Sequence, residues 1–87
     1  MQSLEGKLAV ISGGVSGIGR ATALALARRG ARVAACDLNA DSLAALREAL
    51  AGQGAEVLTE CVDVSSRDAV AAFAARVEAE CGAPDIL

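Results

Sequence analysis

The 87-residue chain has no histidine, tyrosine or tryptophan, and Lys7 is its single lysine. Most side chains that enzymes use as general acids or bases are therefore missing. Cys36, Cys61 and Cys81 are odd in number and lack Cys-x-x-Cys spacing, so neither a disulfide framework nor a zinc site is expected. Without a histidine we expect no metal site, and we interpret the cysteines as small buried hydrophobic residues.

Charge and hydropathy exclude further classes of protein. The formal net charge is −3 and the basic residues form no cluster, so neither nucleic acid nor an anionic membrane is an expected partner. No apolar run approaches the roughly 20 residues that span a bilayer, and residues 1–7 contain no apolar signal core. Eighty-seven residues make one small domain at most, and a hydrophobic content of 54% is typical of a globular chain, for which we expect a cytoplasmic location.

The segment Ser12–Gly19 predicts a phosphate-binding turn. It follows the apolar run 8–11 and precedes an alanine-rich stretch, which is the order strand, turn, helix. Gly13 can adopt backbone conformations closed to other residues, while Gly17 and Gly19 leave no side chain between the turn, a ligand and the neighbouring strand. The first helical turn directs unpaired N–H groups at the same place. The alternative, an ordinary tight turn, does not explain three glycines at this spacing.

Periodicity predicts strands and helices in alternation. Strands are expected over 7–12, 32–36 and 56–62, and helices over 17–29, from Asn39 or Asp41 to 52, and from about 65 to 81. Asp85-Ile86-Leu87 resembles the start of a fourth strand. Right-handed crossovers then give an α/β fold, a Rossmann-type doubly wound parallel sheet with strand order 3-2-1-4 and helices on both faces.

Apolar stripes on the predicted helices indicate the core. The expected buried faces are 18, 21, 24, 25 and 28 on the first helix, Leu43, Leu46 and Leu50 on the second, and Val70, Phe73, Val77 and Cys81 on the third.

Asp37 closes the second predicted strand, about 20 residues after the glycine turn, where a carboxylate can accept hydrogen bonds from the ribose hydroxyls of a dinucleotide. The alternative is a helix-capping or solvated carboxylate. An ionised Asp37 would repel a 2′-phosphate, and positions 16 and 38 hold Ser16 and Leu38 rather than a basic residue. NAD is therefore favoured over NADP. Ser16 is a candidate donor to a phosphate or ribose oxygen, or else a solvated turn serine.

Asp63 directly follows the third predicted strand, and its spacing leaves two interpretations open. It is either a ligand contact or a cap for a helix that starts near Ser65. Ser65-x-x-Asp68 has the form of a capping box with a shorter acid.

The pattern Ser12-Gly13-x-x-x-Gly17-Ile18-Gly19, followed by Asp37, resembles the signature of the classical short-chain dehydrogenase/reductase family. The resemblance covers essentially the whole chain and implies the N-terminal, NAD-binding part of a single dinucleotide-binding domain. It implies that Asp63 accepts from the adenine amino group and that Val64 offers its N–H. The cofactor contacts that we expect are Gly13, Ser16, Gly17, Ile18, Gly19, Asp37, Leu38, Asp63 and Val64.

The family's catalytic Ser and Tyr-x-x-x-Lys motif are absent, as is the Asn-Asn-Ala-Gly that follows the fourth strand. We therefore expect residues 1–87 to be part of a longer oxidoreductase, with no catalytic residue of their own. Hydride transfer between NAD(H) and a small alcohol or carbonyl substrate, and assembly as a dimer or tetramer, are then expected of that longer chain. A non-catalytic nucleotide-binding module and an interaction fragment that binds no nucleotide are the alternatives.

Overall fold

The computed structural model describes residues 3–12 and 17–85. The elements in order are β1 (Leu8–Ser12), α1 (Ile18–Arg28), β2 (Arg32–Asp37), α2 (Ala40–Gly52), β3 (Val57–Cys61) and α3 (Arg67–Cys81). Their alternation confirms the predicted one, with bounds close to those expected. Asn39 is the cap of α2, since its side chain accepts from the Ser42 N–H.

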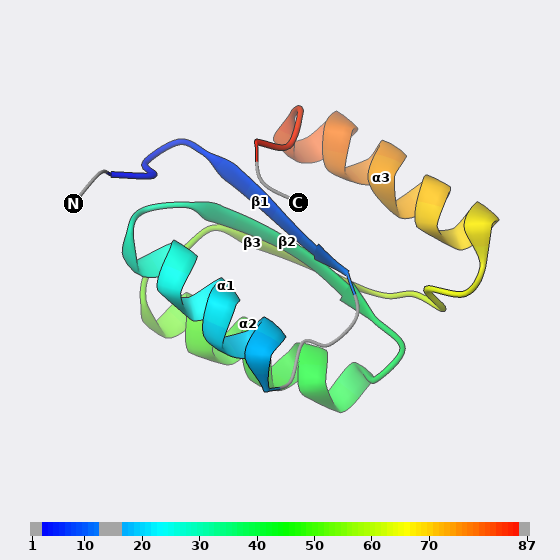
Figure 1. The fold of residues 1–87 in the computed structure, drawn as a ribbon, viewed down its shortest axis with the longest axis horizontal. Helices are drawn as coiled ribbons and strands as arrows, with labels where there is room; N and C mark the ends of the chain where they lie inside the picture. The colour runs from blue at the N-terminus through cyan, green and yellow to red at the C-terminus, as the bar shows by residue number, and fades with distance from the viewer. Residues whose placement is uncertain (1–2, 13–16, 86–87) are drawn as a thin grey trace.

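The three strands form a parallel sheet in the order β1-β2-β3, so β2 lies in the middle. Figure 1 shows α1 and α2 on one face of this sheet and α3 on the other. The α/β fold and the 3-2-1 part of the predicted strand order are thus confirmed. On the outer edge of β1, the Asp85 N–H donates to the Leu8 carbonyl at 2.9 Å, where the fourth strand is predicted to begin. Ile86 and Leu87 lie outside the described residues.

Each face of the sheet carries its own apolar cluster, because successive side chains of a strand point to opposite faces. Val33 and Ala35 of β2 pack with α1 and α2, whereas Ala34 and Cys36 pack with α3. The leucine stripe of α2 is buried as predicted, with Leu43, Leu46 and Leu50 in the core. On α3, Phe73 and Val77 are buried and Val70 and Cys81 are partly buried, which confirms that stripe.

The predicted buried face of α1 is wrong except at Leu24. Ile18 is 85% exposed, and Ala21, Ala25 and Arg28 are exposed too, whereas Ala23, Leu24 and Ala27 pack into the core. Almost every residue of α1 is apolar or small, so apolar spacing could not select a face. The small side chain of Ala23, which is fully buried, lies where the helix meets the sheet.

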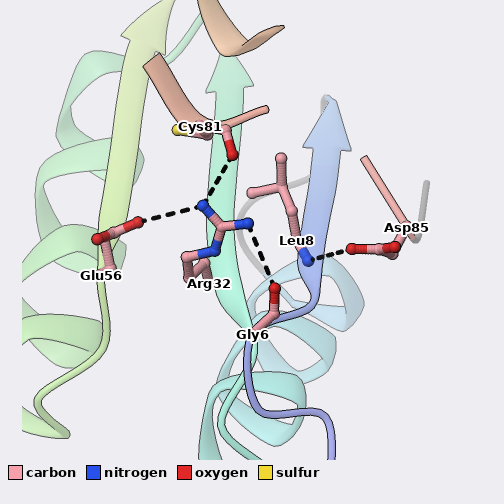
Figure 2. A network of polar contacts seen from close by, with 6 residues as sticks. All are labelled: Gly6, Leu8, Arg32, Glu56, Cys81 and Asp85. Carbon is pink, nitrogen blue, oxygen red and sulfur yellow. Dashed lines mark hydrogen bonds and ion pairs between the residues drawn. The ribbon is translucent and has the colours of Figure 1, made fainter. Parts of the chain in front are cut away.

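The amino end of the sheet is joined by polar contacts from Arg32 (Figure 2). Its guanidinium donates to the Cys81 carbonyl at 2.8 Å and to the Gly6 carbonyl at 3.3 Å, and it lies 3.6 Å from Glu56. A cation at the end of α3 also suits the negative end of the helix dipole. Arg32 therefore ties α3, the segment before β1 and the segment before β3 to the first residue of β2.

Position 30, between α1 and β2, requires glycine both for its backbone conformation and for the space around it. Its φ is +99°, a conformation that other residues rarely adopt. A Cβ atom at this position would lie 3.1 Å from the Glu5 Cα and 3.2 Å from the Glu5 backbone nitrogen. The segment before β1 is thereby packed closely against the turn after α1.

We expect Gly30→Ala to lower the free energy of unfolding by about 1–3 kcal/mol, because the new side chain is strained and also crowds the Glu5 backbone. Urea denaturation measures the change. The matched control is Gly52→Ala, since Gly52 is helical and a Cβ there would meet nothing within 4 Å. That variant should be unchanged or more stable by up to about 1 kcal/mol. Equal effects of the two substitutions would contradict the role given to Gly30.

Candidate functional site

The carboxyl ends of the three strands lie at one edge of the sheet, as the parallel pairing requires (Figure 1). Ser12 at the end of β1 pairs with Cys36, and Asp37 at the end of β2 pairs with Cys61. We call this edge, with Leu38, residues 62–64 and the first turn of α1, the carboxyl rim. In doubly wound sheets, this is the edge where ligands bind.

The first turn of α1 differs from the first turns of the other helices. Its N-cap is Gly17, which has no capping side chain, and its first turn contains no acid. By contrast, α2 has the cap Asn39 and an acid, Asp41, in its first turn, and α3 likewise has the cap Ser66 and an acid in its first turn. Among the described residues, neither an acid in the first turn of α1 nor its N-cap residue compensates the positive end of this helix, which suits an anionic ligand.

Gly17 is a glycine for conformational reasons. Its φ of 60° and ψ of −123° suit only glycine, whereas a Cβ there would meet nothing within 4 Å. The space beside it is thus open. Gly19 lies in the first turn of α1 and is partly buried. Gly13 and Ser16, also predicted to contact the cofactor, lie outside the described residues.

Asp37 is the last residue of β2 and is partly buried. Its Oδ1 accepts from the Asn39 N–H at 3.1 Å, and its carbonyl accepts from the Val62 N–H at 2.8 Å. The carboxylate is therefore held toward the start of α2, and the Asp37 backbone is joined to the residue after β3, both on the carboxyl rim.

Cys61 is exposed, so the expectation that all three cysteines are buried is wrong. It ends the edge strand β3, where one side has no neighbouring strand among the described residues. Its Sγ donates to the Leu38 carbonyl at 3.2 Å. This contact, which the sequence did not indicate, links the backbone after β2 to the end of β3.

Asp63 is exposed, and its Oδ1 accepts two hydrogen bonds from one residue. The Ser65 N–H donates at 2.9 Å and the Ser65 hydroxyl donates at 2.6 Å. Both bonds stabilise the ionised form, the bond from the hydroxyl more than the bond from the N–H. They therefore lower the pKa of the Asp63 carboxyl below its ordinary value of 3.8. Asp63 is thus kept as an ionised acceptor on the carboxyl rim.

The predicted capping box at Ser65 is wrong, because the N-cap of α3 is Ser66. Its side chain accepts from the Ala69 N–H at 3.2 Å, and its backbone is extended. The Ser65 hydroxyl is already donated to Asp63, and this turn delays the start of the helix by one residue. Two adjacent serines can both cap a helix, so the sequence alone did not distinguish them.

Three large hydrophobic side chains are exposed in the described part of the chain: Ile18 at 85%, Leu38 at 65% and Val64 at 47%. All three belong to the carboxyl rim, at the start of α1, after β2 and after β3. Apolar surface left in water is unfavourable by about 25 cal/mol for each Å². A group of such residues at one edge is typical of a binding surface for a partly apolar ligand.

Other kinds of site find no support within the described residues. Their acidic and cysteine side chains do not gather in groups of three or more that could hold a metal ion. Of the helices in residues 3–12 and 17–85, none has the length and apolar character needed to cross a membrane.

Comparison with known proteins gives consistent results. A family described as short chain dehydrogenase matches residues 7–87. The chain is 41% identical over 87 residues to the uncharacterized oxidoreductase YxbG of Bacillus subtilis, an alignment that covers 100% of this chain and 32% of that protein. The chain spans about a third of the length of the first curated relatives that it matches.

Two crystal structures show the same likeness. A metagenomic short-chain oxidoreductase in complex with NADP has a TM-score of 0.91 and 38% identity, covering 99% of this chain and 39% of that one. An NAD⁺-bound xylitol dehydrogenase has a TM-score of 0.88 and 32% identity, covering 97% of this chain and 32% of that one.

We expect the Asp63 carboxyl to titrate below 3.8 in a carbon-13 NMR titration, and Ser65→Ala to raise its pKa toward that value. The pKa of Asp63 is lower in the folded state than in the unfolded state, where it is about 4. The ionised carboxylate therefore stabilises the fold above the unfolded pKa, and this stability is lost as the pH falls through the folded pKa. Ser66→Ala, the matched control, removes a helix cap and should leave this titration unchanged. If Asp63 has the same pKa in the Ser65→Ala variant and in the unchanged chain, the Ser65 hydroxyl is not what lowers that pKa.

Proposed function

The chain belongs to the short-chain dehydrogenase family, and from this premise we propose that it is the NAD-binding part of an oxidoreductase acting on a small alcohol or carbonyl compound. The observation that carries the proposal is the carboxyl rim itself. There, three exposed apolar side chains, Ile18, Leu38 and Val64, accompany a helix whose N-cap is a glycine.

The residues of the rim fit the parts of a dinucleotide. We assign the pyrophosphate to the first turn of α1, where N–H groups and the helix dipole favour an anion. Asp37 is assigned to the adenosine ribose, because an ionised carboxylate can accept from both hydroxyls. Leu38, Asp63 and Val64 are assigned to the adenine base. The complete set of proposed contacts is Gly13, Ser16, Gly17, Ile18, Gly19, Asp37, Leu38, Asp63 and Val64.

The choice of NAD over NADP is a proposal that rests on Asp37. Of the two similar structures above, one holds NADP and the other NAD⁺, so membership of the family leaves the choice open. The Asp37 carboxylate is fixed by Asn39 at the end of β2. A 2′-phosphate beside it would be repelled by roughly a few kcal/mol at an intermediate effective dielectric constant, and Leu38 offers no compensating cation.

The chemistry that NAD supplies when bound is hydride exchange at its nicotinamide ring. This chain has no tyrosine or histidine and has one lysine, Lys7, just before β1 at the opposite edge of the sheet. We therefore propose that its residues bind and orient the adenosine half of the cofactor, and that proton transfer to the substrate belongs to a longer, cytoplasmic and oligomeric enzyme.

Calorimetric titration of the 87-residue chain tests the proposal. NAD⁺ and ADP-ribose should bind with comparable, weak affinity, because the proposed contacts reach only the part that the two ligands share. NADH absorbance with a panel of alcohols and ketones should show no rate above background. Undetectable binding of both ligands would refute the proposed function, and measurable hydride transfer would refute the assignment of proton transfer to other residues.

We expect Asp37→Ala to weaken NAD⁺ binding by about 1–3 kcal/mol through the loss of hydrogen bonds to a charged acceptor. In the same variant, the ratio of the affinity for NAD⁺ to the affinity for NADP⁺ should become smaller. Asp41→Ala is the matched control, since it changes the net charge equally but removes an exposed acid of α2. If the unchanged chain already prefers NADP⁺, the role given to Asp37 is wrong.

A further inference from the structure

We propose that Ser65 is a positioning residue for the adenine base: it holds one oxygen of the Asp63 carboxylate, so that the other is presented to the adenine amino group. The inference rests on the proposed function, because it assumes that the carboxyl rim binds adenosine. It assigns a role to a residue that contacts no ligand itself.

The turn after β3 is closed around Asp63 by three hydrogen bonds. Asp63 Oδ1 accepts from the Ser65 N–H at 2.9 Å and from the Ser65 hydroxyl at 2.6 Å, and the Asp63 carbonyl accepts from the Ser66 N–H at 2.9 Å. Among the described residues no other hydrogen bond reaches the carboxylate. One oxygen is thus engaged by the turn, and Oδ2 stays available as an acceptor.

These contacts matter because Asp63 is exposed. A carboxylate on an exposed turn otherwise rotates freely, and ordering it on binding opposes affinity. A hydroxyl that donates to a carboxylate at 2.6 Å is among the stronger hydrogen bonds in proteins. Ser65 therefore orders the acceptor before the ligand arrives, which is preorganisation.

The Ser65 hydroxyl closes the turn onto Asp63, and it neither caps α3 nor packs into the core. The helix that follows is capped by Ser66, and Ser65 is exposed rather than packed. The same turn carries Val64, whose side chain is 47% exposed on the carboxyl rim. Within the part of the chain that the structure describes, the Ser65 hydroxyl thus donates to Asp63 alone, beside an apolar side chain suited to the base.

The experiment compares NAD⁺ with nicotinamide hypoxanthine dinucleotide, which has a carbonyl in place of the adenine amino group. The unchanged chain should prefer NAD⁺ in calorimetric titrations. Ser65→Ala should weaken NAD⁺ binding about three- to tenfold, as expected for one hydrogen bond, and leave the analogue nearly unaffected. Ser65→Thr keeps the hydroxyl, so this variant should prefer NAD⁺ over the analogue as the unchanged chain does.

Ser66→Ala is the matched control, because it alters the neighbouring serine and removes the cap of α3. It should lower the urea midpoint and keep the ratio of the two affinities. A Ser65→Ala variant with the full preference for NAD⁺ would overturn the positioning role while leaving the proposed function intact. An unchanged chain that binds both dinucleotides equally would also overturn it, and one that binds neither would overturn the proposed function as well.

Discussion

Parallel pairing of β2 with both β1 and β3 is the constraint on which the rest of this structure depends. It places the ends of all three strands at one edge, so that the segments after them converge although they are far apart in sequence. Asp37 pairs with Cys61, so Leu38, just after β2, and Asp63, two residues after β3, lie on the same rim. The register thus determines which side chains can act on one ligand.

The amino ends and the carboxyl ends of the strands differ in how far their polar groups are paired and their apolar side chains are buried. At the amino end, the Arg32 guanidinium satisfies the Cys81 and Gly6 carbonyls, and Gly30 packs against Glu5. At the carboxyl rim, the N-cap of α1 is a glycine without a capping side chain, and apolar side chains stay exposed. One edge therefore holds the helices and strands together, while the other keeps a surface whose polar and apolar groups suit a dinucleotide.

Much of the fold could be predicted from the sequence, because residues 33–36 of β2 form an unbroken apolar run and the leucines of α2 recur at helical spacing. Prediction failed where local pattern was ambiguous. The alanine-rich α1 offers several equivalent faces, and Ser65 and Ser66 are both plausible caps. The bond from Arg32 to Cys81 joins residues 49 positions apart, which no local pattern encodes. The cofactor contacts at the rim stay predictions, because they concern a ligand.

The central claim is that the carboxyl rim binds NAD, and amide chemical shifts test it most directly. In a nitrogen-15 NMR titration of the chain with NAD⁺, we expect the largest changes at residues 17–20, Leu38 and residues 63–64. The amides of Gly6, Gly30 and Gly54, at the opposite edge of the sheet, should keep their shifts and serve as internal references. Changes centred on those three glycines, or spread evenly over both edges, would contradict NAD binding at the carboxyl rim.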